Sequence, residues 1–568
     1  MNARDLAPTV DIALRDPADV MRLEVMGCAF PHRLSFMRIL LRRLKREKWQ
    51  FTRTLWQLDD DGFGVAVLTA TGPHRSYSLV AFSHYLDPAM RSDRVIATKW
   101  DATFTLYDGV PGADDIERLR NNIPKQEAGR VTSREITVSR INRSVRLFDH
   151  VVEQLAQGQQ PDVKLIDDVG YLVRTTAVYG SGKLGAADFE SLHNRPEFAA
   201  PFQAEMLTVY LIREFVTDMV EHIALRRSPS TAVKLQTNIR RKFGIGNSTG
   251  LGMAPYLINH PLILNQWTTV KETALARVRS LTRVSIDEIR KLETLLARAM
   301  LMLNSWRTTD ERQTQRITQL SSELYLAIEV FKNFNFDVSC PWEAFYRSIS
   351  EQRSIECREL IVSLLIETHG SFEDDIETLY RADEFAHFRI DGRWTITRTL
   401  EAIKDHYDWA LKIDFGDSRE VARFWYVSEE KLEPRLGQRF EEAGGELEQP
   451  LGVARDIQAL YQALLPRDRQ ALLSSFLLEC PQFRHVVRRC QLQLAHPYSE
   501  VHDNVLSETL YAVDLLRFKL SFFGAACFDP RSDKWLRITM YQHAPYFSEL
   551  ASTLEDDWFL PPLGAARE

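Results

Sequence analysis

The chain of 568 residues is too long for one ordinary domain, and its composition of 45% hydrophobic and 26% charged residues disfavours disorder. Its formal net charge of −7 and isoelectric point near 6.1 disfavour a general nucleic-acid binder, which needs an excess of lysine and arginine. The six cysteines include no C-x-x-C pair, and no uncharged apolar run approaches the length of a membrane span. We therefore expect a cytoplasmic protein with reduced thiols and no membrane partner.

The first third of the sequence predicts a mixture of helices and closely spaced strands. Helices are expected at residues 34–48, 113–122 and 133–157. The β-branched and aromatic segments that predict strands are 51–58, 63–70, 76–85, 95–100, 103–109 and 171–179. Because the connections between most of these strands are short, they favour an antiparallel meander over crossover units.

The middle of the chain predicts long helices. Ser285 and Glu288 have the spacing of a capping box at a helix start. Two apolar stripes at helical spacing follow, formed by Ile289, Leu292, Leu296, Ala299 and Leu303 and then by Ile317, Leu320, Leu324, Ala327 and Phe331. They predict an antiparallel pair of long helices in a bundle, which a further helix at 343–368 joins.

The last third is predicted to be mainly helical with a small β element. Asp391-Gly392 lies between β-rich arms and predicts a hairpin at 388–397, and residues 441–452 predict a loop. The predicted fold class is α+β and predominantly helical, with an N-terminal antiparallel β-meander followed by a large helical bundle region. The predicted domains are an α+β domain at 1–165, glycine-rich loops with a long-helix bundle at 166–370, and a mostly helical domain at 371–568.

A first glycine-rich segment, AVYGSGKLGAADF, carries G-x-G-x-x-G at Gly180, Gly182 and Gly185. A P-loop needs a glycine five positions before its Gly-Lys pair and a hydroxyl after the lysine, where Ala177 and Leu184 stand. A dinucleotide fold needs a helix that opens on the glycines and a second strand, and neither is predicted after this segment. The motif therefore does not identify a nucleotide fold.

The chemistry of this first segment still favours an anion. Glycines such as Gly180 and Gly182 free backbone N–H groups to converge on one point, and such nests bind anions. Ser181 adds a hydroxyl, Lys183 an ammonium, and Arg174 a guanidinium on the preceding predicted strand. The alternative is a plain strand-to-helix turn with its lysine in solvent.

A second glycine-rich segment, FGIGNSTGLGMAPYLINHP, is richer in polar groups. Gly246 and Gly250 flank Asn247, Ser248 and Thr249, whose short side chains supply hydrogen bonds of the kind that carboxylates and phosphates require. A helix that begins within MAPYLINH would add the favourable field of its N-terminus. The alternative is a hinge or a close contact between helices.

These residues lead to a functional hypothesis. We expect an enzyme that acts on a small anionic metabolite, a carboxylate or a phosphorylated compound, bound by both glycine-rich segments. His260 or Lys183 would transfer a proton, and proton abstraction with elimination is the preferred, lyase-type reaction. The sequence identifies no cofactor, and the long helices offer a surface for a homo-oligomer. The alternative is a non-catalytic nucleotide-binding regulator or a helical scaffold.

Two groups of residues have weaker metal-site patterns. His496, Glu500 and His502 lie within seven residues, but a helix would turn His502 away from the other two. Glu214 and Asp218 share a helical face, as the carboxylates of a di-metal centre do, but no second helix of the E-x-x-H type is present. The alternative for both groups is a polar cluster that binds no metal.

One short stretch is similar to the signature loop of the fumarase and aspartase superfamily. The residues in the same order are Ser248, Thr249, Met253, Pro255, Asn259 and Pro261. The spacing is stretched, apolar residues stand at the lysine position, and the β-rich first third has no counterpart in that superfamily. The similarity does not identify the chain as a member.

Overall fold

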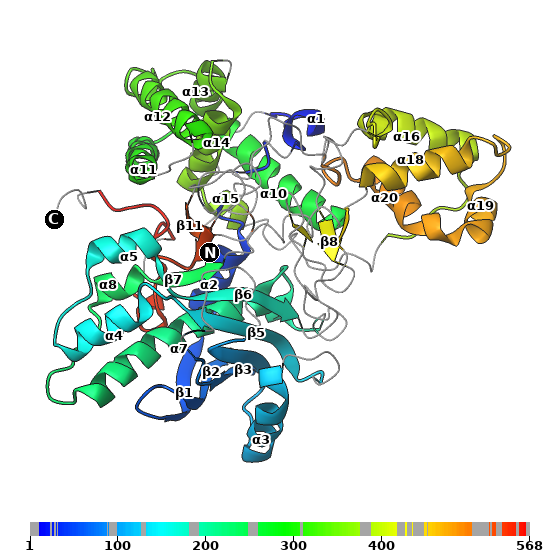
Figure 1. Ribbon diagram of the computed structural model, residues 1–568. Helices are drawn as coiled ribbons and strands as arrows, with labels where there is room; N and C mark the ends of the chain where they lie inside the picture. The colour runs from blue at the N-terminus through cyan, green and yellow to red at the C-terminus, as the bar shows by residue number, and fades with distance from the viewer. Residues whose placement is uncertain are drawn as a thin grey trace. The chain divides into compact units, whose positions relative to one another are not determined.

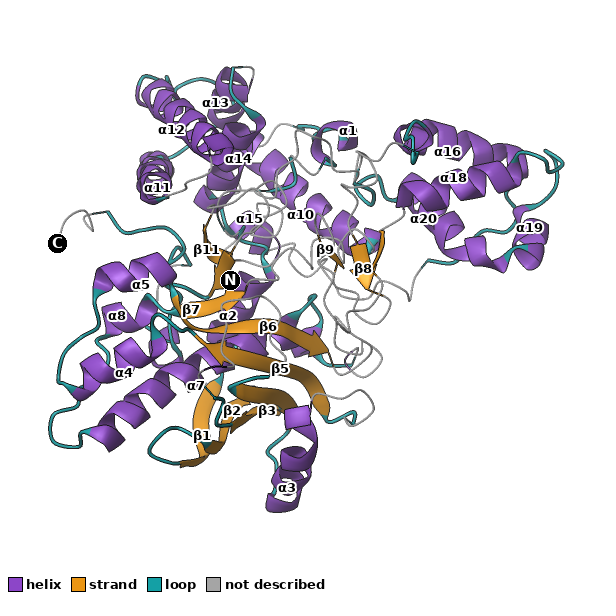
Figure 2. Cartoon of the chain, in the orientation of Figure 1, coloured by secondary structure: helices purple, strands orange, loops and turns teal. Residues whose placement is uncertain are grey.

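The computed structural model describes residues 11–22, 25–27, 30, 32–87, 89, 99–125, 132–180, 192, 194–247, 260–306, 311–350, 352–374, 388–416, 426–428, 434–435, 448–450, 453–501, 522, 525–529, 537–552 and 556–563. It consists of two compact units. Unit 1 comprises Met1–Ala29 and Leu251–Lys519, and unit 2 comprises Phe30–Gly250 and Leu520–Glu568. The predominantly helical α+β class is confirmed (Figure 2). The units are discontinuous in sequence and so differ from the three consecutive segments predicted.

Unit 2 is built around a nine-stranded sheet (Figure 1). Its order is β1 (Gln50–Leu58), β2 (Gly64–Thr71), β3 (Ser76–Ser83), β4 (Ala102–Asp108), β5 (Glu135–Arg143), β6 (Tyr171–Gly180), β7 (Gly244–Asn247), β12 (Arg537–Met540) and β11 (Ala525–Asp529). The first six strands form an antiparallel meander, in which β1 to β4 and β6 match predicted strands and β5 does not. β6 and β7 are parallel, and the remaining pairs are antiparallel. Two strands near the C-terminus therefore extend a sheet that the N-terminal half begins.

The predicted helix at 133–157 is wrong over its first half. Glu135–Arg143 forms β5 between β4 and β6, and the helix α4 covers only Phe148–Ala156. β-Branched residues such as Ile136 and Val138 suit an extended strand, and pairing on both sides satisfies its backbone groups. Of the predicted strand at 95–100, residues 95–98 lie outside the described residues and 99–100 are not in a strand.

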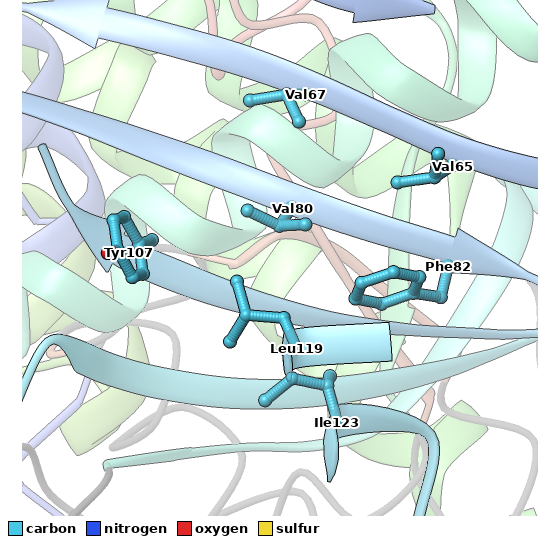
Figure 3. Close-up of a cluster of buried hydrophobic side chains, with 7 residues drawn as sticks. All are labelled: Val65, Val67, Val80, Phe82, Tyr107, Leu119 and Ile123. Carbon is cyan, nitrogen blue, oxygen red and sulfur yellow. The ribbon is translucent and has the colours of Figure 1, made fainter. Parts of the chain in front are cut away.

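Helices pack on both faces of the sheet. The helices of unit 2 are α2 (Phe36–Arg46), α3 (Ala113–Asn122), the 3-10 turn η2 (Ile123–Lys125), α4, α5 (Val163–Val169), the 3-10 turn η3 (Pro196–Phe198), α7 (Gln203–Arg227), α8 (Thr237–Arg241) and α22 (Phe547–Leu550). Phe104 of β4 contacts Phe215 of α7. Tyr107, three residues later on the opposite face, joins Leu119 of α3 in the cluster of Figure 3. The sheet is therefore covered by α7 on one face and by α3 on the other.

A buried arginine on α7 holds the C-terminal segment against the sheet. Arg213 donates to the carbonyl oxygens of Phe243 at 2.7 Å, Ala544 at 3.0 Å and Arg241 at 3.3 Å. Its guanidinium also lies over the ring of Tyr546, 3.8 Å from the centroid. One side chain thus joins α7, the segment before β7 and the segment after β12.

We predict that Arg213→Ala destabilises unit 2 by about 3 kcal/mol or more, because the carbonyl oxygens of Phe243 and Ala544 lose a donor inside the core. Urea unfolding followed by tryptophan fluorescence measures the effect. Arg226→Ala is the matched control on the same helix. The side chain of Arg226 is 58% exposed and makes a surface ion pair with Asp60 at 3.7 Å. The control should change the free energy of unfolding by no more than about 0.5 kcal/mol. Equal effects of the two variants would contradict the role of Arg213.

Unit 1 is mainly helical. Its elements are α1 (Pro17–Val20), α10 (Pro261–Arg279), α11 (Ile286–Ser305), α12 (Glu311–Lys332), α13 (Pro341–Ser350), α14 (Ile355–Thr368), α15 (Ser371–Asp374), α16 (Ile396–Leu411), β8 (Tyr426–Ser428), β9 (Pro434–Arg435), β10 (Glu448–Pro450), α18 (Val453–Leu464), α19 (Leu473–Glu479), the 3-10 turn η6 (Pro481–Phe483) and α20 (Arg484–Ala495). The capping box of Ser285 and Glu288 is confirmed at the start of α11. α11 and α12 pack against each other, and the apolar stripes bury Leu296 and Leu324.

Two predicted elements of unit 1 are wrong. The single helix at 343–368 is divided into α13 and α14, because the hydroxyl of Ser354 accepts from the amide of Cys357 and caps a new helix. The hairpin at 388–397 does not form, since Thr395 caps α16 and Gly392 accepts from the amide of Ser474 instead. The described β element lies later, in the sheet of β10, β8 and β9, and includes part of the predicted loop at 441–452.

A buried histidine links the helices α11, α13 and α14. The indole Nε1 of Trp342 donates to Nε2 of His369 at 2.9 Å, so the proton of the neutral ring lies on Nδ1. That nitrogen is 3.4 Å from the carboxylate of Glu288, the capping residue of α11. Burial lowers the pKa of His369 to about 4, against the opposing effect of Glu288.

We predict that unit 1 loses stability as the pH falls from about 6.5 to 4. Over that range the unfolded chain binds a proton at His369 that the folded chain does not, which costs about 2 to 3 kcal/mol. His369→Gln keeps an acceptor for Trp342 and should abolish most of this loss in urea unfolding at pH 7 and pH 5. His485→Gln is the control, because His485 is 67% exposed and its pKa is raised by Asp456. An unchanged pH dependence in His369→Gln would refute the prediction.

Candidate functional site

The described parts of both glycine-rich segments lie in neighbouring parallel strands. β6 ends at Gly180 and β7 at Asn247, and the two strands pair with Arg174 opposite Gly246 and Thr175 opposite Asn247. Carboxyl ends of parallel strands meet at the same edge of a sheet, which is where ligands bind in open α/β sheets. The carboxyl ends of β6 and β7 therefore point toward the same edge.

The two strands do not end at the same level. β6 continues from Thr175 to Gly180, whereas β7 ends at Asn247, the partner of Thr175. At roughly 3.3 Å per residue, the last residue of β6 lies about 16 Å farther along the strand direction than the last residue of β7. A ligand that contacts the carboxyl ends of both strands must therefore span this offset.

Arg174 and Thr175 project to opposite faces of the sheet. The hydroxyl of Thr175 lies 3.4 Å from that of Ser139, which pairs with Phe104 on the face covered by α7. Strand alternation turns Arg174 to the other face, where its side chain is buried. Arg174 thus places a permanent positive charge beside Gly246 and away from α7.

Two glycines of β7 have a packing role. A Cβ atom at Gly246 would lie 2.6 Å from the ring of Tyr171, and one at Gly244 would meet the carbonyl of Met540 on β12. Contacts this short require that the ring or the neighbouring strand move. The glycine content of this part of the second segment is therefore explained by close packing within the sheet, independently of any ligand.

The remaining predicted residues are placed as follows. Gly180 is the last residue of β6, and Asn247 is the last residue of β7. His260 is the N-cap residue of α10 in unit 1, whereas Arg174 and Gly246 belong to unit 2. Ser181, Gly182, Lys183, Ser248, Thr249 and Gly250 lie outside the described residues, as does MAPYLIN, and the described helix starts at Pro261.

A group of buried hydroxyls beside Thr175 was not predicted. The hydroxyls of Thr137 on β5 and Thr208 on α7 lie 2.7 Å apart. Those of Ser139 on β5 and Thr175 on β6 lie 3.4 Å apart. All four residues are fully buried, so each hydroxyl needs a partner inside the protein. The signal in the sequence is small polar residues at alternate positions of apolar strands, and recognising it requires the strand assignment of β5.

The acidic residues of α7 make protein contacts rather than a metal site. Glu214 accepts from the amide of Phe547 at 2.8 Å and from Arg240 at 3.1 Å, and Asp218 accepts from the same Arg240 nitrogen at 2.9 Å. Burial raises the pKa of Glu214 to about 7, although Arg240 opposes the shift. These contacts fix α8 and the C-terminal segment to α7.

The cluster around His496 does not have the geometry of a metal site in the described part. Both carboxylate oxygens of Glu500 accept from Arg489, and one also accepts from the hydroxyl of Tyr407 at 3.1 Å. His502 lies outside the described residues. Among the residues that the structure describes, no group of three or more histidine, cysteine, aspartate or glutamate side chains could hold a metal ion.

Comparison with known proteins gives no match. No protein-family model matches the chain, and neither a curated protein nor a solved structure does. Within the described residues, no helix combines the length and the apolarity needed to cross a membrane. The evidence for function is therefore the chemistry and placement of the residues themselves.

We predict that Gly246→Ala destabilises unit 2 by about 1 to 3 kcal/mol, because the new methyl group meets the ring of Tyr171. The measurement is a double-mutant cycle with Tyr171→Ala, using urea unfolding. In the Tyr171→Ala background the same glycine substitution should cost no more than about 0.5 kcal/mol. An equal cost in both backgrounds would show that the ring does not set the need for glycine.

Proposed function

We propose that unit 2 binds a small anion, a carboxylate or a phosphorylated metabolite, at the sheet edge where β6 and β7 end, and that the protein is an enzyme acting on it. The observation that supports this most is the parallel pairing of β6 with β7, which brings the carboxyl ends of both strands to one edge of the sheet. Among the described strand pairs, this is the one parallel pair.

The residues supply complementary groups for an anion. Arg174 provides a fixed positive charge at the strand before the first segment. Backbone amides and short polar side chains would provide the remaining hydrogen bonds, and they come from Gly180, Ser181, Gly182, Gly246, Asn247, Ser248, Thr249 and Gly250. Such a site binds by directed donors and needs no bulky side chain near the ligand.

The proposed reaction is proton abstraction followed by elimination. It requires an anion site and one group that moves a proton, which Lys183 of unit 2 would supply. An ammonium such as that of Lys183 becomes a base when burial or nearby positive charge lowers its pKa. The proposed location is the cytoplasm, and the proposed assembly is a homo-oligomer through the long helices.

A second candidate is a non-catalytic protein, either a nucleotide-binding regulator or a helical scaffold. The long helices α11 and α12 favour the scaffold, because α12 leaves Tyr325 and Leu326 60% and 50% exposed. Neighbouring exposed apolar side chains on one helix are a feature of surfaces that contact other proteins. This function would not require the sheet edge of unit 2.

We predict that a carboxylate or phosphate compound raises the melting temperature of the protein. A ligand at 100 times its Kd should stabilise the fold by about 2.7 kcal/mol. Thermal-shift measurements with inorganic phosphate, short dicarboxylates, ATP, NAD and coenzyme A identify the class. Lys183→Ala and Ser248→Ala should abolish the shift.

The controls are Lys125→Ala and Ser230→Ala, which remove the same groups at exposed positions of unit 2 outside both segments. They should leave the shift unchanged. Stabilisation by nucleotides alone would favour the regulator. No stabilisation by any compound would reject the anion site and favour the scaffold.

A further inference from the structure

A guanidinium lies between two buried carboxylates in unit 1. Nε and Nη2 of Arg15 donate to the two oxygens of Glu272 on α10 at 2.8 and 2.7 Å. Nη1 and Nη2 donate to the two oxygens of Glu359 on α14 at 2.6 and 3.2 Å. Two carboxylates thus hold one guanidinium in two bidentate pairs, the arrangement that fits its planar set of donors.

The two carboxylates belong to the helices, whereas the guanidinium comes from the N-terminal segment. Glu272 is fully buried and Glu359 nearly so, and Lys271 provides a third contact by donating to Glu359 at 3.1 Å. Without Arg15, the negative charges of Glu272 and Glu359 would be balanced in this cluster by the single positive charge of Lys271. Buried carboxylates in excess of positive charge are costly, so the helices require a cation at this position.

The N-terminal strap, residues 11–20, has few other buried contacts. Its residues up to 19 are exposed or partly exposed, with Leu14 at 39%, and Val20 is buried at its end. Besides the guanidinium, the carbonyl oxygen of Arg15 accepts from the hydroxyl of Tyr498 at 2.6 Å. The side chain of Arg15 is therefore the main anchor of a strap that buries little apolar surface.

The directions of the pKa shifts of Arg15 and Glu359 agree with the geometry of the cluster. Burial alone would lower the pKa of Arg15, but Glu272 and Glu359 outweigh it and hold the pKa well above its ordinary value. Burial alone would raise the pKa of Glu359, but Arg15 and Lys271 lower it to about 2. The guanidinium and the Glu359 carboxylate therefore stay charged at neutral pH.

We propose that Glu272 and Glu359 form a guanidinium-binding site in unit 1, that Arg15 occupies it as an internal ligand, and that an arginine side chain of a partner protein can replace Arg15 and release the strap. The helices provide the buried receptor, and the exposed part of the strap, residues 11–19, provides a ligand that can leave while Val20 stays packed. The site lies in unit 1, so this proposal is independent of the anion site of unit 2.

The first experiment is chemical rescue of Arg15→Ala by methylguanidinium at millimolar concentration. The variant should melt below the wild type, and methylguanidinium should recover a large part of the lost melting temperature. Methylammonium and sodium chloride at equal ionic strength should recover much less, because neither can make two bidentate pairs. The double variant Arg15→Ala with Glu272→Gln should not be rescued, since one carboxylate of the site is gone.

The second experiment tests exchange in the wild-type protein, so it does not depend on the folding of any variant. The amides of Asp19 and Val20 donate to the carbonyl of Asp16 and should be protected while the strap is bound. Methylguanidinium, or a short arginine-containing peptide, should speed their hydrogen exchange, whereas methylammonium or the lysine analogue of the peptide should not. Equal effects of guanidinium and ammonium compounds in both experiments would overturn the proposal, as would rescue of the double variant.

Discussion

The parallel pairing of β6 with β7 is the constraint on which unit 2 depends. It joins an antiparallel meander of six strands to β12 and β11, which come from the end of the chain. A parallel pair cannot be closed by a tight turn, so the chain between the strands must cross over, and α7 is part of that crossover. The same pairing brings the carboxyl ends of β6 and β7 to one edge, and it places Gly246 opposite Arg174 and against the ring of Tyr171.

Buried arginines hold distant parts of the chain together in both units. In unit 2, Arg213 donates to three main-chain carbonyls on two segments, so its charge is solvated by dipoles and by the ring of Tyr546. In unit 1, Arg15 is paired with two carboxylates. The carbonyl groups around Arg213 are part of the core, whereas the two carboxylates around Arg15 form a site that another guanidinium fits. This difference is why the N-terminal strap, and not the C-terminal segment, is the candidate for exchange.

Local patterns were sufficient for elements whose stability is local. The capping box of Ser285 and Glu288 and the apolar stripe around Leu296 predicted α11, because a helix satisfies its own backbone groups. The same reasoning failed for β5, whose extended form depends on partners on both sides, and for the hairpin at Asp391-Gly392, where Gly392 pairs with the distant Ser474. At the candidate site, Arg174 and the glycines could be proposed from composition alone, but the buried hydroxyls could not.

By itself, the sequence determined the fold class, the meander, the long helices and the two segments whose glycines and short polar residues suit an anion. These depend on periodicity and on residue chemistry, which neighbours along the chain reveal. The tertiary structure decided that the C-terminal strands complete the N-terminal sheet, that β6 and β7 are parallel, and that Gly246 makes room for Tyr171. It also decided that Arg15 meets Glu272 and Glu359. Contacts between residues hundreds of positions apart depend on packing, and no local pattern encodes which distant partner satisfies a buried charge or fills the space above a glycine.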